Sequence, residues 1–440
     1  MRLDLKRYRY RPIFIAVIYS LFTIFLFEFG VVDFKYHDKF LLYFFLFFAH
    51  LGIIFGYFCG IHSKHYTKNE NARNGKEMAK TLFRYSFIVY LITFVPAFMV
   101  GTHTYSSSIA SIISKIQVGL TDSSILYNAN RSVESVSGIW KIINLGLVLT
   151  GFIRWTFFPL AVYLWNELKP YQKVLFFVFA FFYLASYLTT GTTAGIFTIS
   201  FIIVVPFVMK AYRKKYYNEI AYGRKKISKK GRFIRITSVI LGISASLWLF
   251  SNNMESRLGW KTITGDWSSF PWNLVPVSMR SAVYWLTGYV AQGYGALSHC
   301  IDLPFTPTFG LGGSWFLIQN FSSILHVNIL DYTYLGKAEA FGYGAYHNWH
   351  TVYVWLANDV SFIGVPVVLF VLFYLMAQSW RDYLEHNDPF AFIFMTIMGF
   401  FCLYISANNT VFTHSETLFA FWIVLYFWKR NRMKYDYEST

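Results

Sequence analysis

The stretch KFLLYFFLFFAHLGIIFGYFCGIH, residues 39–62, decides the class of this protein. It contains one lysine, at its start, and no carboxylate, and it is long enough to cross the hydrocarbon core of a bilayer, which takes about 17–25 residues. Backbone groups in lipid must find their hydrogen bonds within the segment, so a run of this length has to be helical. The stretch therefore predicts a membrane-spanning α-helix.

Nine further apolar stretches of similar length accompany it. They lie near 12–30, 81–101, 138–165, 172–190, 194–210, 233–250, 361–380, 389–406 and 412–428. Hydrophobic residues make up 55% of the chain and charged residues 14%, whereas soluble domains carry about 25% charged residues. We expect an all-α polytopic membrane protein with about ten transmembrane helices, in which residues 1–440 form a single integral membrane domain.

The formal net charge of +17 follows this expected topology. Lysine and arginine concentrate in cytoplasmic loops. With both termini in the cytoplasm, 28 of the 39 basic residues fall in inside segments and 8 in outside segments. The most basic segment, the cytoplasmic loop 210–235, would suit nucleic acid, but a loop beside anionic lipid headgroups explains it better. We therefore expect membrane lipids, and no nucleic acid, as partners.

One large external loop, residues 251–348, is the place to look for function. It is rich in Trp, Tyr, Gly and Pro, a composition that suits a packed subdomain better than a flexible linker. Within it, residues 281–297 predict a short interfacial or re-entrant helix, and residues 108–118 predict another in the external segment 102–137. The inside loops, in contrast, are short or simply basic.

Several kinds of site are disfavoured by the sequence. The three cysteines, Cys59, Cys300 and Cys402, lie far apart and form neither a disulfide framework nor a CxxC metal site. The external segments contain no Gly-rich phosphate loop, no HExxH motif and no close carboxylate pair. We therefore expect no metal, no cofactor and no nucleotide-driven pumping.

Three arginines are candidates to bind an anion near the external face. Arg280 begins the short aromatic helix, where its fork of donors would match phosphate or pyrophosphate, although snorkelling to lipid headgroups explains it equally well. Arg257 follows a span, where anchoring is the commoner role. Arg154 lies within a span, so it needs either a function or a buried partner such as Asp359, Glu416 or a backbone carbonyl.

Two external histidines form the densest cluster of titratable groups. His347 and His350 would share one face if they lay on one helical turn. One could then act as a general base and the other polarise a phosphate, because imidazole titrates near neutral pH. Zinc would find only two ligands here. The alternative is a pair of interfacial histidines among aromatic anchors.

The arrangement resembles a family, the oligosaccharide repeat-unit polymerases of bacterial surface polysaccharides, often called Wzy-type O-antigen polymerases. The resemblance lies in the aromatic-rich spans, the large late external loop, and the passage from His347–Thr351 (HNWHT) through Asp359 to Gly364. That passage looks like the family's Asn-x-x-Thr followed by Asp-x-x-x-x-Gly. Residues 284–289 (YWLTGY) are also similar in style to the family.

The chain departs from the family at one turn. Between the fifth and sixth spans such proteins often have a Gly-Ser-Arg-like stretch, whereas this chain has Gly191–Thr193 (GTT) and no arginine there. The role of that arginine would fall to Arg154, Arg257 or Arg280, or be dispensed with.

The resemblance implies a metal-independent glycosyltransferase of the bacterial inner membrane. The growing glycan would leave its polyprenyl pyrophosphate and pass to the terminal sugar hydroxyl of a new lipid-linked repeat unit, extending an O-antigen, capsule or similar polysaccharide. A chain-length regulator protein would be a further partner. In the site that this implies, Arg280 would stabilise the leaving pyrophosphate and His347 or His350 would take the acceptor proton. The implied substrate-binding residues are Arg154, Arg257, Tyr284, Asn348, Thr351 and Asp359, the last by orienting an imidazole.

Two other functions share parts of this pattern. An O-antigen ligase, or another transferase of polyprenyl-linked sugars, has the same architecture but a different acceptor, the lipid A core. A flippase or exporter of lipid-linked glycans typically has twelve or more spans and no hundred-residue external loop.

Overall fold

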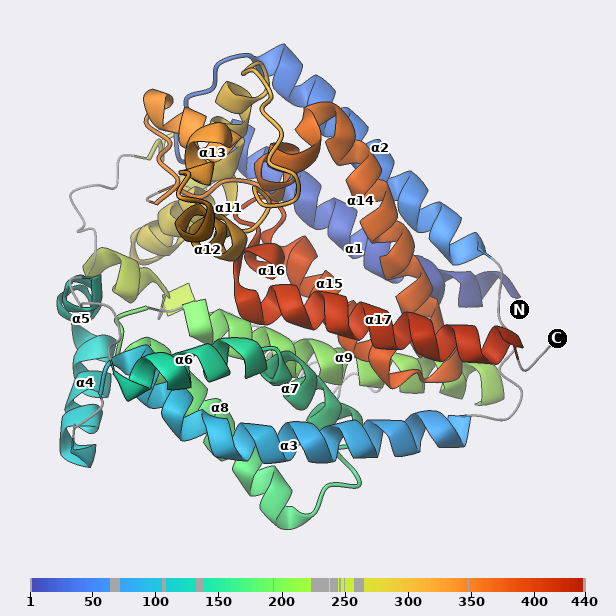
Figure 1. Cartoon of the computed structure of the whole chain (residues 1–440). Coiled ribbons are helices and arrows are strands. Elements are labelled where there is room, and N and C mark those ends of the chain that lie inside the picture. Colours follow the sequence, from blue (N-terminus) through green and yellow to red (C-terminus); the bar gives the residue numbers. More distant parts are fainter. Residues whose placement is uncertain are drawn as a thin grey trace. The chain divides into compact units, whose positions relative to one another are not determined.

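The computed structural model describes residues 2–63, 72–104, 108–131, 138–192, 194–222, 250–256, 265–346 and 348–437, and the single residues 237, 244, 247 and 248. Helices account for 81% of the structure, and the described residues contain no strand. The order of the helices can be followed in Figure 1. The chain forms two compact units: unit 1 comprises Met1–Leu82 and Leu286–Thr440, and unit 2 comprises Phe83–Trp285.

Among the described residues, six helices are long and apolar enough to cross a membrane, and a pair bent by 47° brings the number to seven if it is counted as one span. The six are α1 (Arg2–Phe29), α2 (Lys39–His62), α3 (Ala72–Thr102), α8 (Pro170–Leu188), α9 (Ala194–Tyr222) and α14 (Val352–His386). The bent pair is α6 (Ile139–Thr150) and α7 (Ile153–Tyr163). The prediction of an all-α polytopic membrane protein is confirmed.

The other three predicted spans have different outcomes. The stretch 389–406 forms α15 (Pro389–Tyr404), which at 16 residues is shorter than a full span. The stretch 412–428 is divided between α16 (Thr410–Thr413) and α17 (Ser415–Tyr437). The stretch 233–250 lies almost wholly outside the described residues.

Helix α14 is longer at both ends than the predicted span 361–380. It begins at Val352 because the Thr351 side chain caps it, accepting a hydrogen bond from the Val354 N–H at 3.4 Å. It ends before Asn387, whose φ of 56° is left-handed. Ser361 (φ 58°, ψ 169°) interrupts it with a kink, a backbone conformation that costs a non-glycine residue about 1–3 kcal/mol.

Helices α2 and α14 lie side by side in unit 1 (Figure 1). Gly52, Gly56 and Gly60 recur every four residues along α2 and face the backbone of α14. A Cβ atom added at Gly56 would lie 2.2 Å from the Phe370 carbonyl oxygen, and the other two glycines are as tightly placed. Small residues at this spacing let two helices approach backbone to backbone.

The predicted external loop contributes several helices to unit 1. The described ones are α12 (Trp315–Leu325), η3 (Ile329–Tyr332), α13 (Tyr334–Lys337) and η4 (Ala338–Phe341), together with the C-terminal half of α11 (Val277–Cys300). The helix predicted at 281–297 is therefore present within α11. In the C-terminal half of α11, Tyr294, Leu297 and Cys300 are fully buried, so this half is a core helix of unit 1.

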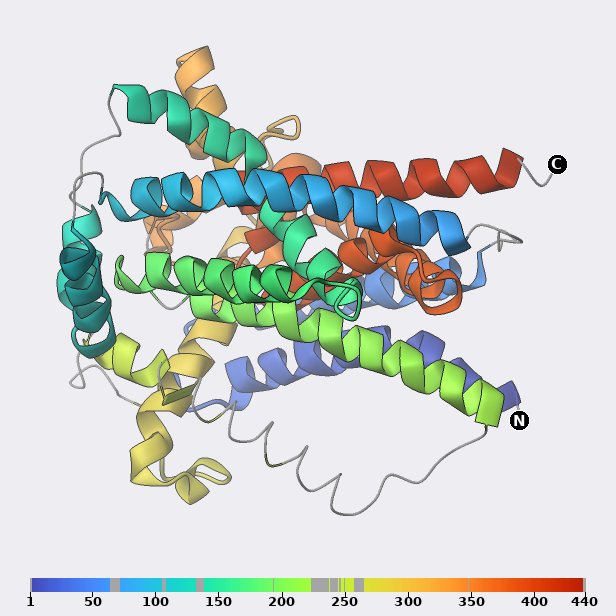
Figure 2. The same cartoon turned by 90° about the horizontal axis from the view of Figure 1, so that it is seen from below.

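Unit 2 is built around aromatic side chains. The rings of Tyr90 and Phe157 stack at 5.2 Å, and Phe179 packs edge-on against Tyr90 at 4.9 Å. Helices α8 and α9 run side by side, as the two green helices of Figure 2 show. The unit also contains α4 (Ile109–Thr121), α5 (Ser123–Arg131) and η2 (Trp272–Leu274). Helix α4 begins where the sequence predicts, capped by the Ser108 side chain.

Candidate functional site

A groove of about 600 Å³ lies in unit 1 between α12, α14, α16 and α17. Most of its wall is aliphatic or aromatic, and its polar residues, Ser314 and Asp359, belong to the end where α14 begins. The lining residues are Gly310, Gly313, Ser314, Leu317, Leu356, Asp359, Val367, Val368, Val371, Leu372, Leu375, Phe412, Leu418, Phe421, Trp422 and Leu425.

The groove has the proportions of a lipid chain. Along α14 it extends from Leu356 to Leu375. At 1.5 Å per residue this is at most about 28 Å, against about 30 Å for the hydrocarbon core of a bilayer. An apolar wall with polar groups at one end suits an amphiphile whose head lies by Asp359 and whose tail follows α14.

Asp359 fixes a glycine-rich loop at the polar end of the groove. Its Oδ1 accepts hydrogen bonds from the Thr308 hydroxyl (2.6 Å), the Gly310 N–H (2.8 Å) and the Gly312 N–H (3.1 Å), and its Oδ2 accepts one from the Gly313 N–H (2.8 Å). These four hydrogen bonds use both carboxylate oxygens to hold the loop in one conformation. Asp359 is thus a positioning residue that shapes the rim of the groove.

Two asparagines complete the fixation of this loop, residues 308–313. The Asn358 amide donates to the Gly312 carbonyl at 2.8 Å, and the Asn409 amide donates to the Gly313 carbonyl at 2.9 Å. Both side chains are fully buried. A Cβ atom at Gly313 would lie 2.7 Å from Asp359 Oδ2, so the N–H groups can reach the carboxylate only because these positions are glycine.

The predicted histidine pair is not on one helical turn. His350 precedes α14 and is not part of a helix, and His347 lies outside the described residues. His350 is 1% exposed, and neither ring nitrogen has a hydrogen-bond partner among the residues that the structure describes, so Asp359 does not orient it. Burial lowers the pKa of His350 to about 4, because the imidazolium would lose its hydration. A substrate cannot reach this side chain.

Thr351 and Asn348, from the same passage as the two histidines, make contacts close to them in sequence. Thr351 is fully buried and caps α14, as described above. Asn348 is half-buried, and its N–H donates to the Gly344 carbonyl at 3.0 Å. The motif therefore builds the start of α14 and the turn before it.

Arg280 lies in unit 2, at the start of α11. Its guanidinium carbon is 5.2 Å from the centre of the Trp267 ring, and its Nε donates to the Val275 carbonyl at 3.4 Å. No hydrogen bond to a described residue engages its two terminal nitrogens. Tyr284, one turn further along α11, packs its ring edge-on against Trp285 at 5.1 Å. The Arg280 side chain is half-buried, and its two terminal nitrogens remain available as donors to an anion.

Arg154 lies where the bent pair of unit 2 breaks, in the first turn of α7. Its guanidinium carbon is 4.4 Å from the centre of the Tyr183 ring, in a cation–π contact. It lines a small pocket of about 30 Å³ with Phe94, Phe98 and other residues of α3 and α8. The aromatic partner provides the compensation that a cation within a span needs. Arg257 lies outside the described residues.

An imidazole–carboxylate pair that the sequence pattern did not single out lies in unit 1. His37 Nε2 is 3.3 Å from Asp302 Oδ2, and both side chains are about half exposed. The His37 ring stacks on His299 at 5.6 Å, and His299 stacks in turn on Phe341 at 5.1 Å. Burial, and then the neighbouring His37, lower the pKa of His299. The sequence offered one signal for this pair, a histidine (His37) in the short segment after the first predicted span, which was expected to be external.

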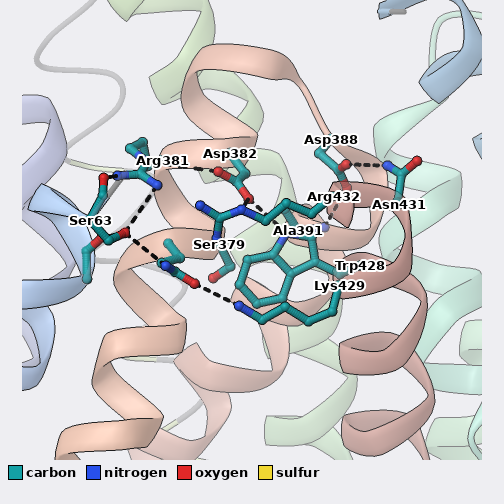
Figure 3. A network of polar contacts seen from close by, with 12 residues as sticks. Ser63, Ser379, Arg381, Asp382, Asp388, Ala391, Trp428, Lys429, Asn431 and Arg432 are labelled. Carbon is teal, nitrogen blue, oxygen red and sulfur yellow. Dashed lines mark hydrogen bonds and ion pairs between the residues drawn. The ribbon is translucent and has the colours of Figure 1, made fainter. Parts of the chain in front are cut away.

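A buried polar network fastens the other end of α14 (Figure 3). The Arg381 guanidinium donates to the carbonyls of Ile61 and Ser63 at 3.2 and 2.7 Å and lies 3.9 Å from Asp382. Asp382 accepts a hydrogen bond from Trp428 Nε1 at 3.0 Å. Arg381 and Asp382 are each 1% exposed. The network therefore ties α2, α14 and α17 together inside the protein.

Asp388 and Gln378 extend this network, and Asp388 connects it to α15. Asp388 caps α15 with one oxygen and accepts from Asn431 Nδ2 with the other at 2.7 Å. Gln378 donates to Ser63 at 2.8 Å and accepts from Lys429 Nζ at 2.7 Å. The sequence pattern had placed Arg381 and Asp388 in a short cytoplasmic loop, where their burial could not be foreseen.

No protein-family model matches the chain, and no curated protein or solved structure matches it.

Proposed function

We propose that this chain is a membrane-embedded glycosyltransferase that polymerises polyprenyl-pyrophosphate-linked oligosaccharide repeat units on the outer face of a bacterial inner membrane. The observation that carries the proposal is the groove along α14, whose apolar wall and polar end match an isoprenoid chain with a polar head. The glycine-rich loop that Asp359 fixes forms the rim of the groove, and in this proposal the glycan head lies beside it.

The reaction needs no metal or nucleotide. An acceptor hydroxyl oxygen forms a bond to the anomeric carbon of the growing glycan, and the bond from that carbon to pyrophosphate breaks, with its electron pair leaving on the lipid-linked pyrophosphate. Arg280 stays the candidate from the sequence to stabilise this developing charge, and its terminal donors are unengaged by described residues.

The acceptor proton requires a base that the substrate can reach. His350 is unsuited because it is buried and stays neutral. His347 stays a prediction from the sequence. The exposed His37 is a second candidate, since its Nε2 faces Asp302 and its Nδ1 is then the nitrogen that takes the proton.

Deleting the chain from a strain with a long-chain surface polysaccharide tests this proposal. We expect the lipid A core to carry single repeat units, restored to long chains by the wild-type chain. Arg280→Ala should accumulate in the membrane and fail to restore them. Loss of all units would favour the ligase or the flippase, and unchanged long chains would refute any role in extension.

A further inference from the structure

Residues 267–279 of unit 2, which lead into α11 and include its first turn, present large apolar side chains outward. Phe270 is 79% exposed, Leu274 70%, Val277 71% and Met279 47%. Leaving such side chains in water forfeits about 1.5–3 kcal/mol each. A run of exposed apolar residues this dense marks an interaction surface. We call this segment the apolar loop.

Local hydrogen bonds hold the apolar loop in shape. The Asn273 N–H donates to the Ser269 carbonyl at 2.9 Å, and the Val275 N–H donates to the Trp272 carbonyl at 3.1 Å. At its start, Asp266 accepts from the N–H and hydroxyl of Ser268. The loop is thus a built structure, in which the apolar side chains are directed outward by the backbone.

The chemistry at the base of the loop indicates what covers it. Arg280 lies over the Trp267 ring, with its terminal nitrogens not bonded to described residues. Tryptophan is enriched at the boundary between headgroups and acyl chains, and arginine there reaches the phosphates with its guanidinium. The positive charge complements anionic phosphate. Two carboxylates in this part of unit 2 are already bonded to serines, Asp266 to Ser268 and Glu255 to Ser251.

We propose that the apolar loop inserts into the outer leaflet of the membrane that the chain spans. Phe270, Leu274 and Val277 enter the acyl region, and Trp267 and Arg280 lie at the level of the phosphates. Segments of this kind penetrate about 5–10 Å below the headgroups. The insertion would hold Arg280 at the depth of a lipid-linked phosphate, but it does not depend on the proposed catalysis.

Depth measurements on spin-labelled full-length protein test the insertion. Cys59, the one exposed cysteine, is replaced by Ser, and Cys300 and Cys402 are left because they are buried. Single cysteines are introduced by F270C, L274C or V277C, and by S268C as the exposed polar control. The nitroxide-labelled proteins are reconstituted into vesicles of phosphatidylethanolamine and phosphatidylglycerol.

Collision rates with oxygen, which concentrates in lipid, and with a water-soluble nickel chelate give the depth of each label. We expect the ratio of oxygen to nickel collisions at 270, 274 and 277 to exceed the ratio at 268 several-fold. Equal ratios at all four positions would show a loop in water. Protection from both reagents would show that protein covers the loop. Either result overturns the proposal.

A charge substitution sharpens this test. In the double variant Phe270→Asp, Leu274→Asp, a label at 277 should shift to the ratio found in water, because two carboxylates oppose insertion. Ser268→Asp should leave that label unchanged. If the double variant keeps the lipid-like ratio, the apolar side chains do not drive the insertion and the proposal fails. An unchanged melting temperature shows that the variants remain folded.

Discussion

The two faces of α14 differ in how closely they approach their neighbours. Toward α2, the glycines at 52, 56 and 60 bring backbone against backbone, whereas toward α17, valine and leucine side chains line a groove of about 600 Å³. Lipid tails are as apolar as leucine, so burying apolar area does not drive helices together in a membrane. Close packing and polar contacts must hold the closed face, and this leaves the open face available to a ligand.

The two ends of α14 show a similar contrast, because each contains a buried or partly buried aspartate with a different role. Asp382 lies among Arg381, Trp428 and Arg432 in a buried network that joins α14 to α17. Asp359 uses its oxygens to shape a loop that borders the groove. Asp382 therefore stabilises helix packing at one end of α14, and Asp359 shapes the rim of the groove at the other end.

The largest expected effect is at the closed end. Arg381→Met removes the donor to the carbonyls of Ile61 and Ser63 and one of the cationic neighbours of the buried Asp382, while Arg432 stays 4.0 Å from that carboxylate. Breaking a buried pair in this way costs about 3–5 kcal/mol. The free energy of unfolding in detergent micelles measures it. Lys215→Met is the control: that side chain is 53% exposed and 3.9 Å from Glu219, so it should change by less than about 0.5 kcal/mol. Equal losses in the two variants would contradict the role of the network.

A smaller effect is expected on the closed face. Gly56→Ala adds a Cβ atom 2.2 Å from the Phe370 carbonyl oxygen, so α2 and α14 must separate. We expect a loss of about 1–3 kcal/mol in the free energy of unfolding. Gly146→Ala on α6 is the matched control, because its Cβ would meet nothing within 4 Å and alanine favours a helix by about 1 kcal/mol. A stabilised Gly56→Ala variant would show that the two helices are not in backbone contact.

Long apolar runs were enough to predict the helices of the fold, because spanning a bilayer imposes a length on each. The start of α14 was missed because Asn358 and Asp359 look like loop residues, and their buried partners lie about 45–50 positions away. The four-residue spacing of Gly52, Gly56 and Gly60 is a further local signal, typical of close helix packing, from which no prediction was made. An apolar run or a glycine repeat can be read within one segment of the sequence. The burial of a residue depends on the packing of several segments.

The site was less predictable than the fold. His350 looked reachable, but only the tertiary structure shows it buried. The groove was invisible because residues that line it, such as Val371, have the same composition as residues that face lipid. The pairing of His37 with Asp302 joins positions more than 260 residues apart. None of these features follows from local spacing.

The most direct test introduces a large side chain into the groove on the open face of α14. It then measures glycan chain extension by the purified protein in vesicles. Val371, which lines the groove, is changed to Trp, and Ile363, which is 89% exposed and does not line it, is changed to Trp as the control. Both positions are exposed to some degree, so we expect both variants to keep the stability of the wild type within about 0.5 kcal/mol.

With polyprenyl-pyrophosphate-linked repeat units as substrate, the wild type and Ile363→Trp should produce a ladder of extended glycans. Val371→Trp should lose at least about tenfold in extension rate, which corresponds to about 1.4 kcal/mol. A wild-type protein that extends nothing would contradict the proposed function. A ladder from Val371→Trp equal to that of the wild type would contradict the assignment of the groove to the lipid chain.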